Sequence, residues 1–388
     1  MPVINRIAAL TDEMTAWRHD IHAHPETAFE EVRTAEVVAS QLAAFGIEVH
    51  RGLGKTGVVG TLKVGTGSGA IGLRADMDAL PVQEANTFAH CSTHAGRMHA
   101  CGHDGHTAVL LGAAKYLAET RNFDGTVHFI FQPAEEGYGG AKKMIDDGLF
   151  QRFPVDAVYG LHNMPRLPVG QFSVRPGAMM ASSATFQIVV TGKGTHGAMP
   201  HTGVDPIVCA AQIVTALQTL VSRETNPEDE AVLTVASIHA GDAFNVIPDS
   251  CTIAGTARAF SSRVDGALNA GMHRIVTGIA AAMGCTATVD YKLIYPALVN
   301  DPHHVDVVAE AMRDVVGDAN VHANGFRTMG SEDFAFMLEA MPGAYVFLGN
   351  GEDSAMVHNP RYDFNDAALP VGASFFARLV ERTLARAA

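Results

Sequence analysis

Residues 106–133 read HTAVLLGAAKYLAETRNFDGTVHFIFQP, and this stretch decides the fold. HTAVLLGAAKYLAET is typical of a helix, and TVHFIFQP of a strand that ends at a proline. Working outward, GVVGTLKVG and AIGLRADM predict earlier strands around the turn TGSG, while AKKMIDDG and DAVYGLHN predict a further helix and strand. This alternation indicates an α/β domain with a mostly parallel central sheet.

The order of predicted elements changes near the middle of the chain. ATFQIVVTG, AVLTVASIHAG, CTIAGTARAF and TATVDYKLIYP predict strands, with helices after the first and third of them. The resulting order β-α-β-β-α-β is that of a ferredoxin-like module. The α/β pattern then resumes and closes with the helix VGASFFARLVERTLARA. We therefore expect a discontinuous α/β domain over residues 1–182 and 295–388, with an α+β ferredoxin-like domain inserted at 183–294.

Composition excludes several classes of protein. With 388 residues the chain is too long for one ordinary core, so two domains are expected. The net charge of −14, with no basic cluster, argues against a nucleic-acid or membrane surface. The apolar stretches AVLLGAA and IVTGIAAAM are shorter than the ~20 residues that span a bilayer, and the N-terminus lacks a secretory signal. Five scattered cysteines without CxxC spacing suit the reducing cytoplasm.

A glycine-rich stretch offers one misleading motif. Residues 67–72 match GxGxxG, which in dinucleotide-binding proteins opens a helix that receives the pyrophosphate. Here a predicted strand follows instead, so we interpret the stretch as a hairpin turn. An oxidoreductase therefore has little support from this sequence.

Residues 98–108, MHACGHDGHTA, raise the question of a metal site. Cys101 and His103 are two apart, so in an extended segment their side chains share one face. A thiolate and an imidazole form a partial site for zinc or a similar metal. Two ligands are not a site, however, and on this stretch alone a metal site and an ordinary polar cluster are equally supported.

Further polar residues follow predicted strands elsewhere in the α/β domain. Glu135 and Glu136 follow TVHFIF, His162 ends the next strand, and His358 comes after AYVFLG. Taken singly, a surface glutamate pair or a hydrogen-bonded histidine is the commoner explanation of each. Because active-site groups gather at the carboxyl ends of such strands, the four together favour a shared site.

Seven motifs run in order along the chain: RADMDALPVQE, MHACGHDGHTA, QPAEEGYGGAKKMI, GLHNMP, GTHGAMPHTGVDPI, MGSEDFAF and HNPRYDFND. Together they resemble the metal-dependent amidohydrolase family of hippurate hydrolases, bacterial N-acyl-amino-acid amidohydrolases and plant auxin-conjugate hydrolases. The resemblance covers about Trp17 to Asp366. It implies hydrolysis of N-acyl or N-aroyl amino acids by two divalent metal ions, zinc first, with manganese, cobalt or nickel as alternatives.

The resemblance also implies a set of metal ligands. Cys101 would bridge the two ions, in a branch of the family that has cysteine where most relatives have aspartate. Asp78 would orient a ligand from outside the metal shell. Asp76 is not carried over as a ligand. The remaining ligands would be His103, Glu136, His162 and His358.

Catalytic and substrate-binding roles follow from the same resemblance. Glu135 would be the general base and acid. His196, from the inserted domain of a partner subunit, would stabilise the developing oxyanion. Asn245 and Arg258 would hold the α-carboxylate of the substrate. The domain at 183–294 would then be both a lid and the interface of a homodimer, with a homotetramer as the larger alternative.

Rival functions stay open at this point. A dipeptidase or carboxypeptidase shares the scissile amide and the carboxylate, and a deacetylase of N-acetyl-diaminopimelate would share the same two-metal mechanism. A catalytically silent metal- or ligand-binding relative is the alternative outside the enzymes. The presence of Glu135 argues against it, because a silent relative is free to lose that residue.

Overall fold

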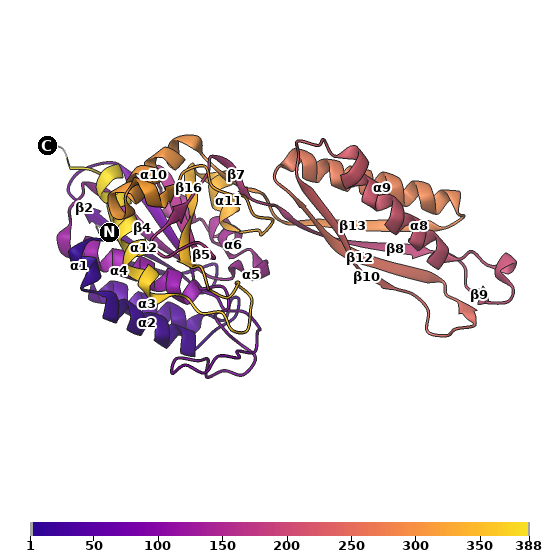
Figure 1. Cartoon of the computed structure of the whole chain (residues 1–388), viewed down its shortest axis with the longest axis horizontal. Helices are drawn as coiled ribbons and strands as arrows, with labels where there is room; N and C mark the ends of the chain where they lie inside the picture. The colour runs from indigo at the N-terminus through magenta and orange to yellow at the C-terminus, as the bar shows by residue number, and fades with distance from the viewer. Residues whose placement is uncertain (1–2, 387–388) are drawn as a thin grey trace. The chain divides into compact units, whose positions relative to one another are not determined.

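The computed structural model describes residues 3–386, which divide into two compact units (Figure 1). Unit 1 comprises Met1–Gly177, Val299–Phe326 and Asp333–Ala388. Unit 2 comprises Ala178–Leu298 and Arg327–Glu332. We expect from the sequence a boundary at residues 183 and 294. The contacts place it a few residues further out on both sides and add a short later segment to unit 2.

Unit 1 is built on an eight-stranded sheet in the order β1-β2-β4-β3-β5-β16-β6-β15. The four central strands β4, β3, β5 and β16 run parallel. On one side β2 is antiparallel to β4 and to β1, and on the other β6 is antiparallel to β16 and parallel to β15. The predicted α/β class with a mostly parallel sheet is confirmed. The strands are β1 (Glu48–Leu53), β2 (Gly57–Val64), β3 (Ala70–Asp76), β4 (Gly125–Gln132), β5 (Ala157–Pro165), β6 (Phe172–Ser173), β15 (Val321–His322) and β16 (Gly343–Gly351).

Helices cover both faces of this sheet. One face packs a large apolar core against α1 (Asn5–Ala8), α2 (Thr11–Ala23), α3 (Val32–Ala44), α4 (His103–Thr120), α10 (Pro302–Val316) and α12 (Leu369–Thr383). The other face carries α6 (Gly140–Asp146) and α11 (Phe334–Ala340), which contact β4, β5 and β16. Two single-turn helices, α5 (Glu135–Tyr138) and α7 (Leu149–Arg152), lie on either side of α6 in the chain.

The stretch that opens the sequence analysis forms α4 and β4, as predicted. Helix α4 is buried almost throughout from His103 to Leu117, so it is a core helix and not an amphipathic surface one. Because β3, α4 and β4 form a parallel crossover unit, β4 lies directly beside β3. The predicted hairpin at TGSG is therefore wrong: β2 and β3 are separated by β4, which pairs with both.

Unit 2 has the predicted ferredoxin-like order. Strands β8 (Ser183–Thr191), β10 (Ala231–His239), β12 (Ser250–Ala259) and β13 (Thr286–Tyr295) form an antiparallel sheet in the order β10-β12-β8-β13. Helices α8 (Pro206–Thr219) and α9 (Ser262–Ala282) close its core. A short pair, β9 (Thr195–His196) and β11 (Val246–Ile247), lies apart from the sheet. Strands β7 (Gly177–Met180) and β14 (Leu298–Asn300) stand where the chain passes between the units.

One segment of unit 2 has the length and composition of a membrane span. Pro206–Glu224, which is α8 with the π-helical turn after it, covers 19 residues with a mean hydropathy of 1.2. It is longer than the apolar stretches that the sequence analysis singles out. Its buried side chains Cys209, Ile213 and Leu217 belong to the core of unit 2. The core helix of a folded domain passes the same test, so this finding is weak support for a membrane span.

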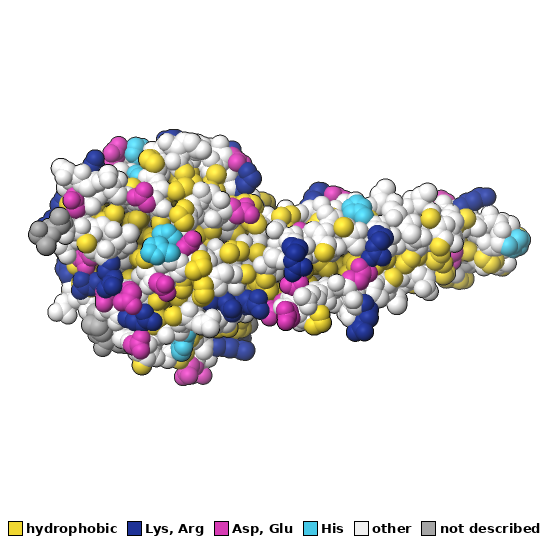
Figure 2. Space-filling view, turned by 90° about the horizontal axis from the view of Figure 1, so that it is seen from above, with side chains coloured by type: hydrophobic (Ala, Val, Ile, Leu, Met, Phe, Trp, Pro, Cys, Tyr) yellow, Lys and Arg dark blue, Asp and Glu magenta, His cyan; other side chains and the backbone are white. Residues whose placement is uncertain are grey.

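The surface carries charges of both signs. On the face seen in Figure 2, lysine and arginine side chains alternate with aspartate and glutamate, and no broad basic area is visible among the described residues. The chain as a whole carries a net charge of −14.

Candidate metal centre

The N-terminus of α4 places two of the predicted ligands. Cys101 is buried just before the helix, and His103 is its first residue. Between them Gly102 has φ 95°, in the left-handed region. A Cβ at Gly102 would collide with Asn163 Oδ1 and lie 2.6 Å from Tyr362 Oη. The expectation of an extended segment is thus wrong: a glycine turn, and not strand alternation, sets the two side chains.

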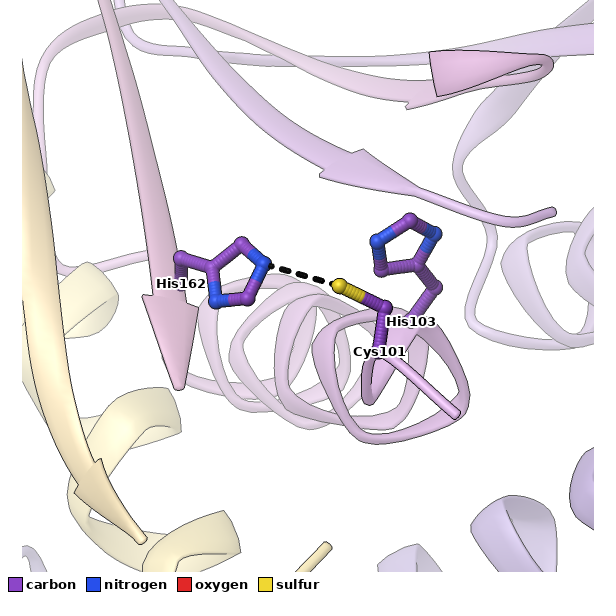
Figure 3. A group of neighbouring side chains, drawn as sticks. All are labelled: Cys101, His103 and His162. Carbon is purple, nitrogen blue, oxygen red and sulfur yellow. Dashed lines mark hydrogen bonds between the residues drawn. The ribbon is translucent and has the colours of Figure 1, made fainter. Parts of the chain in front are cut away.

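The predicted ligands form two groups that share Cys101. One group is Cys101, His103 and His162, and the other is Cys101, Glu136 and His358. Within each group the ligand atoms all lie within 4.8 Å of one another. Cys101 Sγ is 3.4 Å from His162 Nε2 and lies between the two imidazole rings (Figure 3). His358 Nε2 is 3.3 Å from Glu136 Oε1. A sulfur common to two donor groups has the placement of a bridging ligand.

The imidazole rings are oriented by hydrogen bonds on their far sides. His103 Nδ1 lies 3.2 Å from Asp78 Oδ1, and His162 Nδ1 donates to the carbonyl of Asn163 at 2.6 Å. Such partners leave Nε2 of each ring available for a metal ion. His103 Nε2 and Glu136 Oε1 are buried and have no hydrogen-bond partner among residues 3–386. Polar atoms buried in proteins are usually paired, and a bound cation would pair with both of these.

Asp78 also organises the glutamate pair. Its Oδ1 accepts a hydrogen bond from the backbone N–H of Glu135 and its Oδ2 one from that of Glu136, both at 3.0 Å. One carboxylate therefore aligns His103 and both glutamates, which is the orienting role that the sequence analysis expects for it. Glu135 is buried, and its carboxylate lies within 4.8 Å of a ligand atom of both His103 and Glu136.

Burial and neighbouring carboxylates shift the pKa values of two predicted ligands. Burial and then the nearby Glu136 and Glu135 raise the pKa of the Cys101 thiol well above its usual value. Burial opposes the charged form of His103, but Asp76 and Asp78 outweigh it and raise its pKa to about 10. Two divalent cations would balance this negative charge. Metal binding requires the thiolate and the neutral imidazole, so it would release protons from both groups.

A second buried layer lies behind these side chains. His106 Nδ1 is 2.5 Å from Asp76 Oδ1, and His106 Nε2 is 2.6 Å from Asn163 Oδ1. Arg74 Nη1 donates to Asp76 Oδ2 at 2.7 Å. The sequence analysis assigns no role to His106 or Asn163. Asn163 follows the predicted ligand His162 within the motif GLHNMP, and this is the only sequence signal that places it near the site.

Another buried network braces α4 from the side of α2. Arg18, fully buried, donates to Asp104 at 3.1 Å, and His22 Nδ1 lies 2.9 Å from the same carboxylate. His22 Nε2 is 3.2 Å from Glu84. Because Asp104 follows His103 directly, this network holds the first turn of α4 in place.

The three predicted residues of the inserted domain lie in unit 2. His196 is exposed in β9 and pairs with Val246 of β11. The N–H of Gly197 donates to the carbonyl of Asn245 at 2.7 Å. His196 and Asn245 therefore both lie at the small two-stranded sheet of β9 and β11. Arg258, on β12, is partly buried and donates to Ser331 Oγ at 2.9 Å. The two metal-binding groups described above are in unit 1.

Comparison with known proteins identifies relatives along the whole chain. A family model described as peptidase family M20/M25/M40 matches residues 72–382. A hippurate hydrolase of Campylobacter jejuni is 44% identical over 384 residues, which cover 99% of this chain and 100% of that protein. An IAA-amino acid hydrolase of Arabidopsis thaliana is 42% identical, over 96% of this chain and 85% of that protein.

A solved structure shares the fold of this chain. It is a Bacillus subtilis protein described as a dinuclear metal binding peptidase from the M20 family. The TM-score is 0.86 at 35% identity, over 97% of this chain and 99% of that one.

Proposed function

We propose, from the premise that this chain belongs to peptidase family M20/M25/M40, that it hydrolyses the amide bond of N-acyl or N-aroyl amino acids. The products are a carboxylic acid and a free amino acid. The observation that carries the proposal is the pair of donor groups that share Cys101, with the carboxylate of Glu135 within 4.8 Å of the ligand atoms of His103 and Glu136. The relatives described as hippurate hydrolase and IAA-amino acid hydrolase support this substrate class.

Two divalent cations would be held by the two groups that share Cys101. One group adds His103 and His162, and the other adds Glu136 and His358. When bound, they supply Lewis-acid activation of water and of the amide carbonyl. Glu135 takes a proton from the attacking water and returns it to the nitrogen of the leaving amine. Asp78 keeps this carboxylate in place by holding the N–H groups of Glu135 and Glu136.

The remaining roles fall to unit 2. His196 stabilises the negative charge that develops on the carbonyl oxygen, acting in the site of a partner subunit. Asn245 and Arg258 bind the α-carboxylate of the substrate, for which the planar guanidinium of Arg258 is suited. The inserted domain at 183–294 thus serves as lid and as the interface of a homodimer.

The proposal also covers the identity of the metal ions and the cellular compartment of the protein. A site with one thiolate, three imidazoles and one carboxylate suits zinc, with manganese, cobalt or nickel as alternatives. The cysteines Cys91, Cys101, Cys209, Cys251 and Cys285 are all free thiols, which suits a reducing cytoplasm.

Replacement of the proposed base tests the function. Glu135→Gln should lower kcat for hippurate by at least roughly 10²–10⁴-fold, the usual cost of losing a positioned base. The purified variant should still hold two metal ions per chain by elemental analysis, because Glu135 is not assigned as a ligand. Wild-type protein stripped by a chelator is the control and should regain activity when Zn²⁺ is added back. Near-wild-type turnover of Glu135→Gln would refute the assignment.

A comparison of substrates distinguishes an amidohydrolase from a dipeptidase. N-benzoyl-glycine, N-acetyl-glycine and a dipeptide with C-terminal glycine share the amide nitrogen side and differ in the group on the carbonyl side, where the dipeptide carries a free amine. N-acetyl-diaminopimelate shares the acetyl group of N-acetyl-glycine and differs in the amino acid. Preference for the acylated compounds in kcat/KM supports the amidohydrolase, and preference for the dipeptide favours a dipeptidase.

A further inference from the structure

The backbone just before Glu135 is held in a strained conformation. Ala134 has φ 55° and ψ 44°, in the left-handed region, which is unfavourable for a residue with a Cβ. Ala134 is also fully buried. Because it directly precedes Glu135 and Glu136, its conformation sets the direction in which both side chains leave the end of β4. The surrounding structure must supply contacts that hold it there.

The side chain of Glu31 supplies such a contact from a distant part of the chain. Glu31 is fully buried, and its Oε1 accepts hydrogen bonds from the N–H groups of Ala134 and Phe29, both at 2.9 Å. Its Oε2 accepts from Thr56 Oγ at 2.6 Å. Phe29 has φ 61°, so one oxygen holds two residues in the left-handed region. Glu31 and Ala134 are 103 positions apart in sequence.

Two carboxylates together bind three consecutive backbone N–H groups at the end of β4. Glu31 takes that of Ala134, and Asp78 takes those of Glu135 and Glu136. We propose that Glu31 is a positioning residue for hydrolysis: by holding Ala134 in the left-handed conformation, it aims the Glu135 carboxylate at the reacting water. This inference rests on the proposed function of Glu135.

Burial of the Glu31 carboxylate costs free energy, and this cost supports a role beyond packing. Its hydrogen bonds among residues 3–386 come from two backbone N–H groups and one hydroxyl, and none comes from a cationic side chain. Burial, together with the nearby Asp78, raises the pKa of Glu31 to about 7 in spite of the Thr56 hydrogen bond. A buried carboxylate without a counter-ion is expensive, and the hydrogen bonds that it accepts must offset its desolvation. A demand of the active site explains why the carboxylate stands there.

Three variants test the proposal on the metal-loaded protein. Glu31→Ala removes both oxygens, whereas Glu31→Gln keeps one oxygen that can accept from Ala134. Glu30→Gln is the matched control, since Glu30 is the exposed neighbour, 58% exposed and paired with Arg97. We expect Glu31→Ala to lower kcat for hippurate by roughly 10–100-fold with KM changed less than about threefold. Glu31→Gln should restore most of kcat, and Glu30→Gln should match the wild type.

Hydrogen–deuterium exchange gives a readout that does not depend on turnover. Exchange over residues 133–140 should be at least about tenfold faster in Glu31→Ala than in Glu30→Gln, with two metal ions still bound by elemental analysis. Unchanged exchange, or an equal loss of kcat in Glu31→Gln and Glu31→Ala, would overturn the positioning role. Should Glu31→Ala not fold, Thr56→Val removes the donor to Oε2 and should show the same changes at smaller amplitude.

The same measurements distinguish an error in the proposed function from an error in the positioning role. If wild-type protein hydrolyses no N-acyl amino acid, the function is wrong, while the exchange measurement still reports whether Glu31 holds the loop. If the wild type is active and neither Glu31 variant changes kcat, the function stands and the positioning role is wrong.

Discussion

At the scale of single residues, carboxylates decide how the donor atoms of the site are presented. Asp78 touches His103, Glu135 and Glu136, so one side chain links α4 to the glutamate loop. Asp104, in the first turn of α4, binds Arg18 and His22 of α2 and so links these two helices. In the proposed mechanism none of these acids has to touch substrate. They restrict the orientations of the side chains and backbone groups that they bind.

His22 makes the stability of the fold depend on pH. Burial disfavours its charged form, but Asp104 and then Glu84 outweigh burial and raise its pKa to about 9 from an ordinary 6.5. A raised pKa means stability that is complete below pH 6.5 and is lost as the pH rises through about 9, up to about 3 kcal/mol. We expect the destabilisation caused by His22→Gln to be largest at pH 6 and to shrink toward pH 9.5.

Urea unfolding of the metal-free protein at several pH values measures this difference without interference from metal binding. His24→Gln is the control, because His24 is partly exposed and lies two residues further along the chain. A destabilisation by His22→Gln that stays constant from pH 6 to pH 9.5 would show that packing, and not charge, is what the ring contributes.

At the scale of elements, the start of α4 is the critical structure. The helix begins at His103, and the left-handed Gly102 turns the chain so that Cys101 and His103 enter the same site. Neither strand alternation nor helical spacing produces this arrangement. It depends on a residue without a Cβ, packed against Asn163 and Tyr362.

Gly102→Ala should therefore disrupt the centre. The substitution adds both left-handed strain and a collision with Asn163 and Tyr362, and each costs roughly 1–3 kcal/mol. Gly96→Ala is a matched control, since Gly96 has φ 76° but nothing within 4 Å of its Cβ position. We expect Gly102→Ala to lose much of its Zn²⁺ affinity by competition with a chelator, while Gly96→Ala loses about 1 kcal/mol of stability and keeps its affinity. Equal behaviour of the two variants would show that the collision is unimportant.

At the scale of the whole molecule, the residues of the proposed mechanism are distributed over both units. Unit 1 contains the two metal-binding groups, and unit 2 has its own core and carries His196, Asn245 and Arg258. The first and last strands of the sheet of unit 2 in chain order meet, because Ser183 of β8 is the register partner of Tyr295 of β13. An insertion with adjacent ends can be removed without stretching the rest of the chain.

Deletion of residues 184–294, with a short Gly-Ser linker in their place, should leave a folded unit 1. We expect it to bind two Zn²⁺ ions by elemental analysis and to hydrolyse hippurate at least about 100-fold more slowly than the full chain, since the residues proposed for the oxyanion and the carboxylate are gone. In sedimentation the full chain should be a dimer and the deletion variant a monomer. Full activity in the deletion variant would remove unit 2 from the mechanism.

Local patterns in the sequence were enough to predict the α/β class, the helix α4, the strand β4 and the inserted ferredoxin-like order, because these depend on spacing within a few residues. The motifs also named the side chains that the structure brings together around Cys101. Only the tertiary structure placed β4 between β2 and β3, set Cys101 in two groups at once, and joined Glu31 to Ala134 across 103 positions. Such contacts follow from the packing of distant segments and their buried hydrogen bonds, and no local spacing in the sequence records them.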